Sequence, residues 1–364
     1  TLTPEQLADL RNRAQVAIRV SVIPGYQELL TTLRSLINDA PNQIGVGQFA
    51  GGAEFYDYAL RHHTTTDLSA AEIHQLGLDE LARIHTEMRA IFDQLGYPQN
   101  ETLQQSFARV ASDGGIVAAA DSLQTFEDLV AFAEANLNRA FDLFPAAAVV
   151  VLSDPFGGFY VGPSFDGTRP GAFYAGTDFN QAYFQMPSLA FHETVPGHHL
   201  QIAIAMEQDV PQFRKIERQT AFTEGWALYA ERLAWELGWY DNDVYGNLGR
   251  LQYEALRAAR LVMDTGIHRL GWSFDEAARF NEQNVGWSRP ASENAAARYS
   301  VFPGQATAYM VGMLQILAER QRAMDELGAN FDLIAFHRAV LTNGSVPLAL
   351  LDDVVDAYIA DNID

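Results

Sequence analysis

The sequence predicts a mainly helical protein with a small β-sheet set into the helical body. Capping boxes open long amphipathic stretches, and the clearest is Ser69-Ala70-Ala71-Glu72, followed by apolar residues at helical spacing. Residues 146–187 instead combine an apolar run with many Gly and Pro residues, which favours short strands joined by tight turns. From Ser188 onward the helical pattern resumes and continues to the end of the chain.

The helices are expected in the following order. Thr3-Pro4-Glu5-Gln6 combines a capping Thr with Pro at the first helical position, and the breaker pair Pro24-Gly25 is expected to end this helix. A second short helix is expected from Gln27 to Ile37. The later helices are predicted at 69–96, 123–141, 188–206, 213–237, 244–269, after Ser273, and at 292–299, 305–327, 331–342 and 353–359.

Length and composition favour a folded protein with a large core. Of the 364 residues, 48% are hydrophobic and 19% are charged, so intrinsic disorder is not expected. Without an internal repeat or a flexible linker, residues 1–364 are predicted to form a single domain, in which two lobes would flank a cleft. The chain begins at Thr1 rather than Met, so an upstream segment is expected to have been removed.

The charge balance limits the partners. With 24 Lys and Arg against 46 Asp and Glu, the formal net charge is −22, which repels DNA, RNA and anionic lipid. No stretch reaches the roughly 18 apolar residues that a membrane span needs. The chain has no Cys, which excludes disulfides and thiolate metal sites. These features predict a soluble protein and leave its location open between the cytosol and export, for example to the periplasm.

The segment His192-Glu193-Thr194-Val195-Pro196-Gly197-His198-His199 carries the strongest chemical signal. Catalytic zinc uses three protein ligands and one open position, and in the H-E-x-x-H pattern two His on one helix face bind the ion while the Glu acts on its water. Here the fourth position after His192 is Pro196, which cannot bind a metal. His199 would lie about 10 Å further along a regular helix, too far from His192 to share an ion.

We therefore expect the helix to be interrupted by a bulge at Pro196-Gly197, because Pro lacks the N–H of the helical ladder and Gly tolerates unusual backbone angles. His192 and His198 then become the zinc ligands and Glu193 the general base, while His199 either supports the ligands from outside or faces the substrate. The swapped assignment, with His199 as the ligand, stays open. So does a site without metal, in which the histidines only cap or pack a kinked helix.

The third ligand is expected to be Glu224, which follows His198 by 26 residues, enough for one helix to end and another to return. Two His and one Glu form the ligand set of a catalytic zinc site, whereas structural zinc usually uses Cys. Glu231, about two helical turns beyond Glu224, is expected to orient the site or to pair with Arg232.

Several separated motifs, found in the same order, resemble those of the domain-of-unknown-function 885 family from about residue 50 to the C-terminus. The family is grouped with glutamate-zincin peptidases, so the resemblance implies a gluzincin-like fold, with a small sheet beside the metal-binding helix, and a longer N-terminal region than this chain has. The motifs are His192 to His199, Thr223-Glu224-Gly225-Trp226-Ala227-Leu228-Tyr229-Ala230-Glu231, Asp264-Thr265-Gly266-Ile267-His268, Arg298-Tyr299 with Pro303-Gly304-Gln305-Ala306, and the stretch from Thr64-Thr65-Thr66 to Gly77.

The Arg298-Tyr299 pair, followed by a Gln, also resembles helical peptidyl-dipeptidases such as angiotensin-converting enzyme. This second resemblance implies that Tyr299 stabilises the tetrahedral oxyanion and that Arg298 either supports the site or contacts a carboxylate of the substrate. The alternative for Tyr299 is a packing role in the core. Tyr309 is a further candidate for substrate binding, and His268 is a weaker one.

Together these observations predict a zinc metallopeptidase that hydrolyses short peptides with a metal-activated water and Glu193 as general base. The segment from Gly171 to Thr177 is expected to be a sheet edge along which an extended peptide pairs. Two alternatives remain: a zinc hydrolase of a non-peptide amide or ester, and a zinc-stabilised scaffold without turnover. The sequence leaves open the peptide specificity, the oligomeric state, and whether zinc, cobalt or manganese is the working metal.

Overall fold

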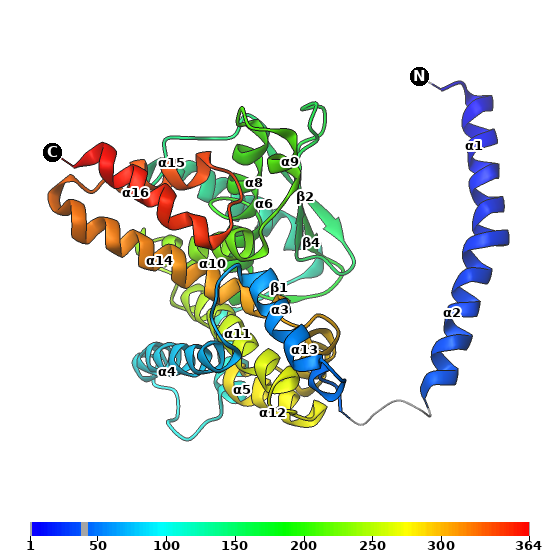
Figure 1. The fold of residues 1–364 in the computed structure, drawn as a ribbon, viewed down its shortest axis with the longest axis horizontal. Helices are drawn as coiled ribbons and strands as arrows, with labels where there is room; N and C mark the ends of the chain where they lie inside the picture. Colours follow the sequence, from blue (N-terminus) through cyan, green and yellow to red (C-terminus); the bar gives the residue numbers. More distant parts are fainter. Residues whose placement is uncertain (1, 38–42, 364) are drawn as a thin grey trace. The chain divides into compact units, whose positions relative to one another are not determined.

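The computed structural model describes residues 2–37 and 43–363. The contacts within the chain divide it into two compact units, Thr1–Gln43 and Ile44–Asp364 (Figure 1). Every residue predicted to form the zinc site belongs to the second unit.

The first unit consists of helix α1 (Pro4–Ala17), a π-helical turn η1 (Ile18–Val22) and helix α2 (Ile23–Leu36), and none of these residues is buried. The predicted capping box at Thr3 is present. The expectation that Pro24-Gly25 ends the helix is wrong. The N–H of Ile23 bonds to the carbonyl of Ile18, five residues back, and this wider turn accommodates the ring of Pro24 inside a continuous helical segment.

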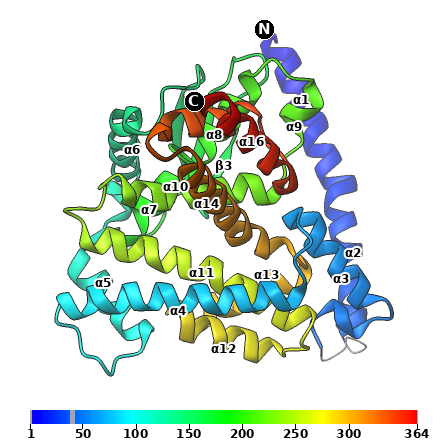
Figure 2. The same ribbon diagram turned by 60° about the vertical axis from the view of Figure 1, so that its left-hand side comes forward.

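Two pairs of long helices organise the second unit. Helix α4 (Ala70–Gln94) packs along α11 (Val244–His268), and α10 (Thr220–Glu236) packs against α14 (Ala308–Leu327) (Figure 2). A Cβ atom on Gly225 would lie 2.5 Å from the Cα of Gly312, so the absence of side chains lets α10 and α14 approach closely. The prediction of a mainly helical protein is confirmed.

Shorter helices complete the body. The α-helices are α3 (Gly52–Thr64), α5 (Leu103–Gly114), α6 (Ala119–Asn136), α7 (Met186–Glu193), α8 (His198–Glu207), α9 (Gln212–Ile216), α12 (Phe274–Val285), α13 (Arg289–Val301), α15 (Leu333–Thr342) and α16 (Leu351–Asn362). Single turns of 3-10 helix are η3 (Val46–Gln48), η4 (Leu137–Arg139), η5 (Tyr183–Gln185), η6 (Gln305–Thr307), η7 (Gly328–Asn330) and η8 (Leu348–Leu350).

The strands fall in the predicted segment, with one strand pair reaching back to residue 116. Strands β2 (Val149–Asp154), β4 (Gly171–Gly176) and β3 (Phe159–Val161) form a sheet in that order, with β2 parallel and β3 antiparallel to β4. Strands β1 (Ile116–Val117) and β5 (Gln181–Ala182) form a separate antiparallel pair.

The expectation that Gly171–Thr177 is a sheet edge is wrong, because β4 is the central strand and its backbone pairs on both sides. Glycines in and beside the sheet allow close packing. A Cβ on Gly157 would lie 1.8 Å from the amide nitrogen of Gly176, and one on Gly171 would lie 2.6 Å from Nδ1 of His199. The sheet thus packs against the start of α8, and its exposed edges are β2 and β3.

The motif from Asp264 to His268 anchors other segments to the end of α11. Asp264 is buried and accepts hydrogen bonds from the Tyr56 hydroxyl (2.6 Å) and the Gly304 amide (2.9 Å). The Nε2 atom of His268 donates to the carbonyl of Tyr299 (2.9 Å). These bonds hold α3, α13 and the turn before η6 against α11. The residues of this motif therefore have a structural role.

Asp264 makes the stability of the fold depend on pH. Burial raises the pKa of its carboxyl to about 7, although the bonds from Tyr56 and Gly304 act to lower it. A carboxyl whose pKa is raised on folding stabilises the native state at low pH, and this contribution is lost as the pH rises towards the native pKa. Relative to Asp264→Asn, we expect the wild-type free energy of unfolding to fall by about 1.4 kcal/mol per pH unit between about pH 5 and pH 7 and then to level off. Denaturant titrations over this range test it, and a flat difference would contradict the raised pKa.

Candidate metal centre

The histidine-rich segment forms two helices separated by a tight turn. Helix α7 ends at Glu193 and α8 begins at His198, and the Val195–Pro196 peptide bond between them is cis. Gly197 packs so closely on the end of α7 that a Cβ there would lie 2.0 Å from the carbonyl oxygen of His192. The helix is interrupted where the sequence predicts, although by a four-residue break rather than by a bulge within one helix.

The break brings three side chains from three helices together. Nε2 of His198 (α8) lies 3.4 Å and Nε2 of His192 (α7) lies 3.7 Å from Oε2 of Glu224 on α10. One ligand atom from each residue lies within 4.8 Å of the other two, and no other such group of His, Asp and Glu occurs among residues 2–37 and 43–363.

The spacing of these atoms fits a zinc ion. Tetrahedral zinc with bonds of roughly 2.0–2.1 Å separates two ligand atoms by about 3.4 Å. The two distances to Glu224 are close to this value and longer than ordinary hydrogen bonds to a carboxylate. Two imidazoles and one carboxylate also leave the fourth zinc position open, as catalytic sites require.

Glu231 orients the ring of His192. Its Oε1 accepts a hydrogen bond from Nδ1 of His192 (2.8 Å), and its other oxygen accepts one from the hydroxyl of Ser188. This contact directs Nε2 of His192 towards Glu224, which is how ligand histidines are commonly held. Of the two roles predicted for Glu231, the structure shows the orienting one, since Arg232 pairs with Glu236 instead (3.2 Å).

The ring of His198 is held in a different way. Its Nδ1 atom is buried without a hydrogen-bond partner among the described residues. The ring packs edge-on against His192, with ring centroids 4.7 Å apart. Packing rather than a hydrogen bond therefore sets its orientation.

His199 lies outside the cluster, and the structure does not bring it to the cavity above the cluster. Its Nε2 donates to the carbonyl of Ala147 (3.1 Å) and its Nδ1 accepts from the hydroxyl of Tyr160 (2.8 Å). Burial lowers its pKa to about 4, which keeps the ring neutral. His199 therefore ties α8 to the sheet, and the structure places His198, not His199, beside His192 and Glu224.

A cavity of about 660 Å³ opens over the cluster, and Glu193 lies in its wall. The Glu193 side chain is 6% exposed, and burial chiefly raises its pKa to about 8, with Glu224 adding to this effect and His198 opposing it. No described residue forms a hydrogen bond or ion pair with its carboxylate. Glu193 is thus a buried carboxylate beside the proposed ligands, in the wall of the cavity.

Of the residues predicted to bind substrate or stabilise charge, Arg298 and Tyr309 line the cavity and Tyr299 does not. The hydroxyl of Tyr299 is buried and accepts a hydrogen bond from Nε of Arg260 (2.9 Å). The ring of Tyr309 lies against the same guanidinium, with its centroid 4.4 Å from Cζ.

Sequence reasoning missed the wall that α11 contributes. Tyr253, Leu256, Arg257 and Arg260 line the cavity at intervals of three and four residues, which is one face of a helix. Nearly all of α11 is buried, so charged residues inside its apolar pattern were the signal that could have indicated a site. Trp287, from the loop before α13, was also missed.

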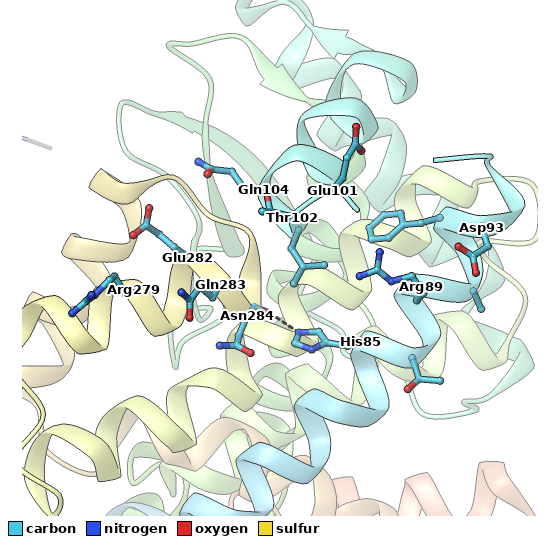
Figure 3. Close-up of a pocket in the computed structure, with 14 residues that line it drawn as sticks. His85, Arg89, Asp93, Glu101, Thr102, Gln104, Arg279, Glu282, Gln283 and Asn284 are labelled. Atoms are coloured by element: carbon cyan, nitrogen blue, oxygen red, sulfur yellow. Dashed lines mark hydrogen bonds between the residues drawn. The ribbon is translucent and has the colours of Figure 1, made fainter. Parts of the chain in front are cut away.

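A larger cavity of about 990 Å³ lies between the C-terminal part of α4, the start of α5 and α12 (Figure 3). His85 donates there to the carbonyl of Asn284 (2.8 Å). Its lining contains Arg89 and Arg279 as well as Asp93 and other carboxylates, so charges of both signs are mixed. The arrangement indicates no particular chemistry.

Comparison with known proteins places the chain in a family. A match over residues 1–355 is to the family described as "Bacterial protein of unknown function (DUF885)". The chain belongs to this DUF885 family. The family resemblance expected from the motifs is thereby confirmed. The comparison with curated proteins gave no match.

Two solved structures are similar to this DUF885 chain. A "putative lipoprotein" from Colwellia psychrerythraea is 34% identical, with a TM-score of 0.94 over 99% of this chain and 64% of that one. A "putative lipoprotein of unknown function" from Shewanella oneidensis is 19% identical, with a TM-score of 0.77 over 97% and 67%, a likeness that shows the fold alone. The chain thus spans 64% of the length of the Colwellia protein. Among the described helices, none has the length and hydropathy needed to cross a membrane.

Exchanging the histidines one at a time tests the metal centre. We expect His192→Ala and His198→Ala to lose bound zinc, because each removes a ligand atom, and His199→Ala to retain it. Metal content per chain, measured by atomic emission after dialysis against zinc buffer, distinguishes them. Loss of zinc in His199→Ala with retention in His198→Ala would reverse the assignment.

The contact between Glu231 and His192 gives a second prediction. Glu231→Gln should weaken zinc binding by about 10–100-fold while leaving all three ligands in place, since it disturbs the hydrogen bond that orients one of them. Competition with a chromogenic chelator measures the affinity. Glu236→Gln, on the same helix but facing Arg232 and Arg320, is the matched control and should bind zinc like the wild type.

Proposed function

We propose that this DUF885 protein is a zinc metallopeptidase that acts on short peptides. The observation that carries the proposal is the convergence of His192, His198 and Glu224 at zinc-ligand spacing beside the buried Glu193, in the wall of a cavity. Two histidines from one segment with a Glu from a later helix resemble the glutamate-zincin arrangement, although here the histidines are six positions apart.

His192, His198 and Glu224 would hold the ion. Bound zinc would lower the pKa of a water molecule and polarise the carbonyl of the substrate. Glu193 follows His192 directly, lines the cavity and has no competing partner among the described residues, so it can take a proton from the attacking water and return it to the leaving amine.

The edge strand β3 supports a peptide as the substrate. Gly158, Phe159 and Tyr160 line the cavity, and within the described strands β3 pairs with β4 alone. An extended peptide can therefore pair with the free backbone groups of β3. A non-peptide amide or ester would use the same catalytic groups, but it would gain nothing from this edge.

Tyr309 replaces Tyr299 as the proposed oxyanion donor. Tyr309 lines the cavity together with Glu193 and the proposed ligands, whereas Tyr299 lies behind the wall with its hydroxyl bound to Arg260. A phenol at this position can donate a hydrogen bond to the charge that develops on the substrate carbonyl. The description of the Colwellia relative as a putative lipoprotein supports an exported location for this protein as well.

Glu193→Gln tests the proposal directly. The change keeps the shape of the side chain and removes its basicity, so we expect peptide turnover to fall by about 10²–10⁴-fold with zinc content unchanged. Mass spectrometry of a mixed peptide library, beside a panel of amides and esters, measures turnover. Glu127→Gln, on the exposed face of α6, is the control and should behave as wild type.

Wild-type turnover in Glu193→Gln would exclude this residue as the base. Cleavage of amides or esters without cleavage of peptides would assign a different substrate to the same centre. A wild-type protein that holds zinc and turns over none of these compounds would instead be a zinc-stabilised scaffold.

A further inference from the structure

Arginines gather around the cavity of an otherwise strongly acidic protein. The whole chain carries a net charge of −22, yet the charged residues that line this cavity other than its histidines are two carboxylates and four guanidinium groups. They are Glu193, Glu224, Arg218, Arg257, Arg260 and Arg298. The lining is therefore more positive than negative, and a divalent cation on the proposed ligands would increase the difference. Such a cavity attracts anions.

Arg260 is buried without an acidic partner. The residue is 8% exposed, and no carboxylate of the described residues lies within 4.0 Å of its guanidinium, the limit for an ion pair. Nε donates to the hydroxyl of Tyr299, while Nη1 is buried and has no hydrogen-bond partner among the described residues. A buried cation left in this state is costly, so the missing partner points to a ligand.

The other buried arginines of α11 are paired. Arg250 lies 2.7 Å from Glu254, and Arg257 lies 3.4 Å from Glu231. Glu224 acts on Arg260 from beyond ion-pair distance, and as a proposed zinc ligand it shares its charge with the ion. Arg260 therefore differs from its neighbours on the same helix in having no carboxylate of its own.

Arg298 extends the positive lining towards solvent. It is exposed, donates from Nη2 to Oε1 of Gln305 (3.3 Å), and has no ion-pair partner among the described residues. It directly precedes Tyr299, whose hydroxyl holds Arg260. One residue of α13 thus faces the cavity while the next fixes the guanidinium of α11.

We propose that Arg260 and Arg298 form a carboxylate-binding subsite, so that the peptides this cavity takes carry a carboxylate close to the bond that is cleaved. The planar guanidinium matches a carboxylate in charge and geometry, and Nη1 of Arg260 is a donor that no described residue uses. The carboxylate comes either from the C-terminus of the peptide or from an Asp or Glu side chain. The subsite rests on the proposed function only for the statement that its ligand is a peptide.

Three acetylated alanine peptides of equal length test the proposal: one with a free C-terminus, its C-terminal amide, and an amide in which one Ala is replaced by Glu. Calorimetric titration into zinc-loaded Glu193→Gln protein measures binding without cleavage. We expect one or both acidic peptides to bind about tenfold or more tightly than the neutral amide, because each supplies the anion that the buried cation lacks. Preference for the free acid assigns the C-terminal carboxylate, and preference for the Glu peptide assigns the side chain.

The same titrations with Arg260→Gln or Arg298→Gln added should remove most of the difference between acidic and neutral peptides while zinc content stays unchanged. Arg279→Gln, which removes an exposed Arg paired with Asp275 on α12, should preserve it. If Arg260→Gln does not fold, as judged by circular dichroism, the exposed Arg298→Gln still decides the question. Equal binding of all three peptides, or a preference that survives both substitutions, would overturn the subsite.

The test of the carboxylate-binding subsite can fail or succeed independently of the test of the peptidase proposal. Selective binding of an acidic peptide that wild-type protein never cleaves would keep the subsite and reject the peptidase. Cleavage of all three peptides with equal kcat/KM and equal binding would keep the peptidase and reject the subsite.

Discussion

The interruption between α7 and α8 is the constraint on which the rest of the centre depends. In an unbroken helix, six residues advance about 9 Å along the axis, so His192 and His198 could not serve one ion. The turn between them brings the two rings to a centroid separation of 4.7 Å. Glu224 then needs only to approach from α10, which the close packing of α10 on α14 holds in place.

Buried charge links the wall of the cavity to this centre. Glu231 carries the bond that orients His192, and its negative charge is in turn balanced by Arg257 from α11 (3.4 Å). Helix α11 therefore holds Glu231 against His192, a proposed ligand, while Arg260 on the same helix lines the cavity without an ion-pair partner among the described residues. The end of the same helix is fixed by hydrogen bonds of Asp264 and His268, and its middle by the pairing of Arg257 with Glu231.

The sequence predicted those features that depend on local spacing. The position of the helix break follows from the backbone properties of Pro196 and Gly197, whereas helix geometry favoured His198 and left His199 open as the alternative. Predictions that depended on distant partners were wrong or incomplete. Strand β4 is central because β2 and β3 pair with it, which no local pattern reveals. Tyr299 and Tyr309 both suit an oxyanion donor by type, but the direction of each side chain follows from how α13 and α14 pack.

The hydrogen bond between Tyr160 and His199 has a consequence for where a peptide would be cut. It joins the edge strand β3 to the residue that directly follows His198. A peptide paired with β3, as proposed, would therefore be held in a fixed register relative to the proposed metal ligands. The position of the scissile bond would then depend on the register between the peptide and β3. The side chains of the peptide would affect its affinity rather than the position of cleavage.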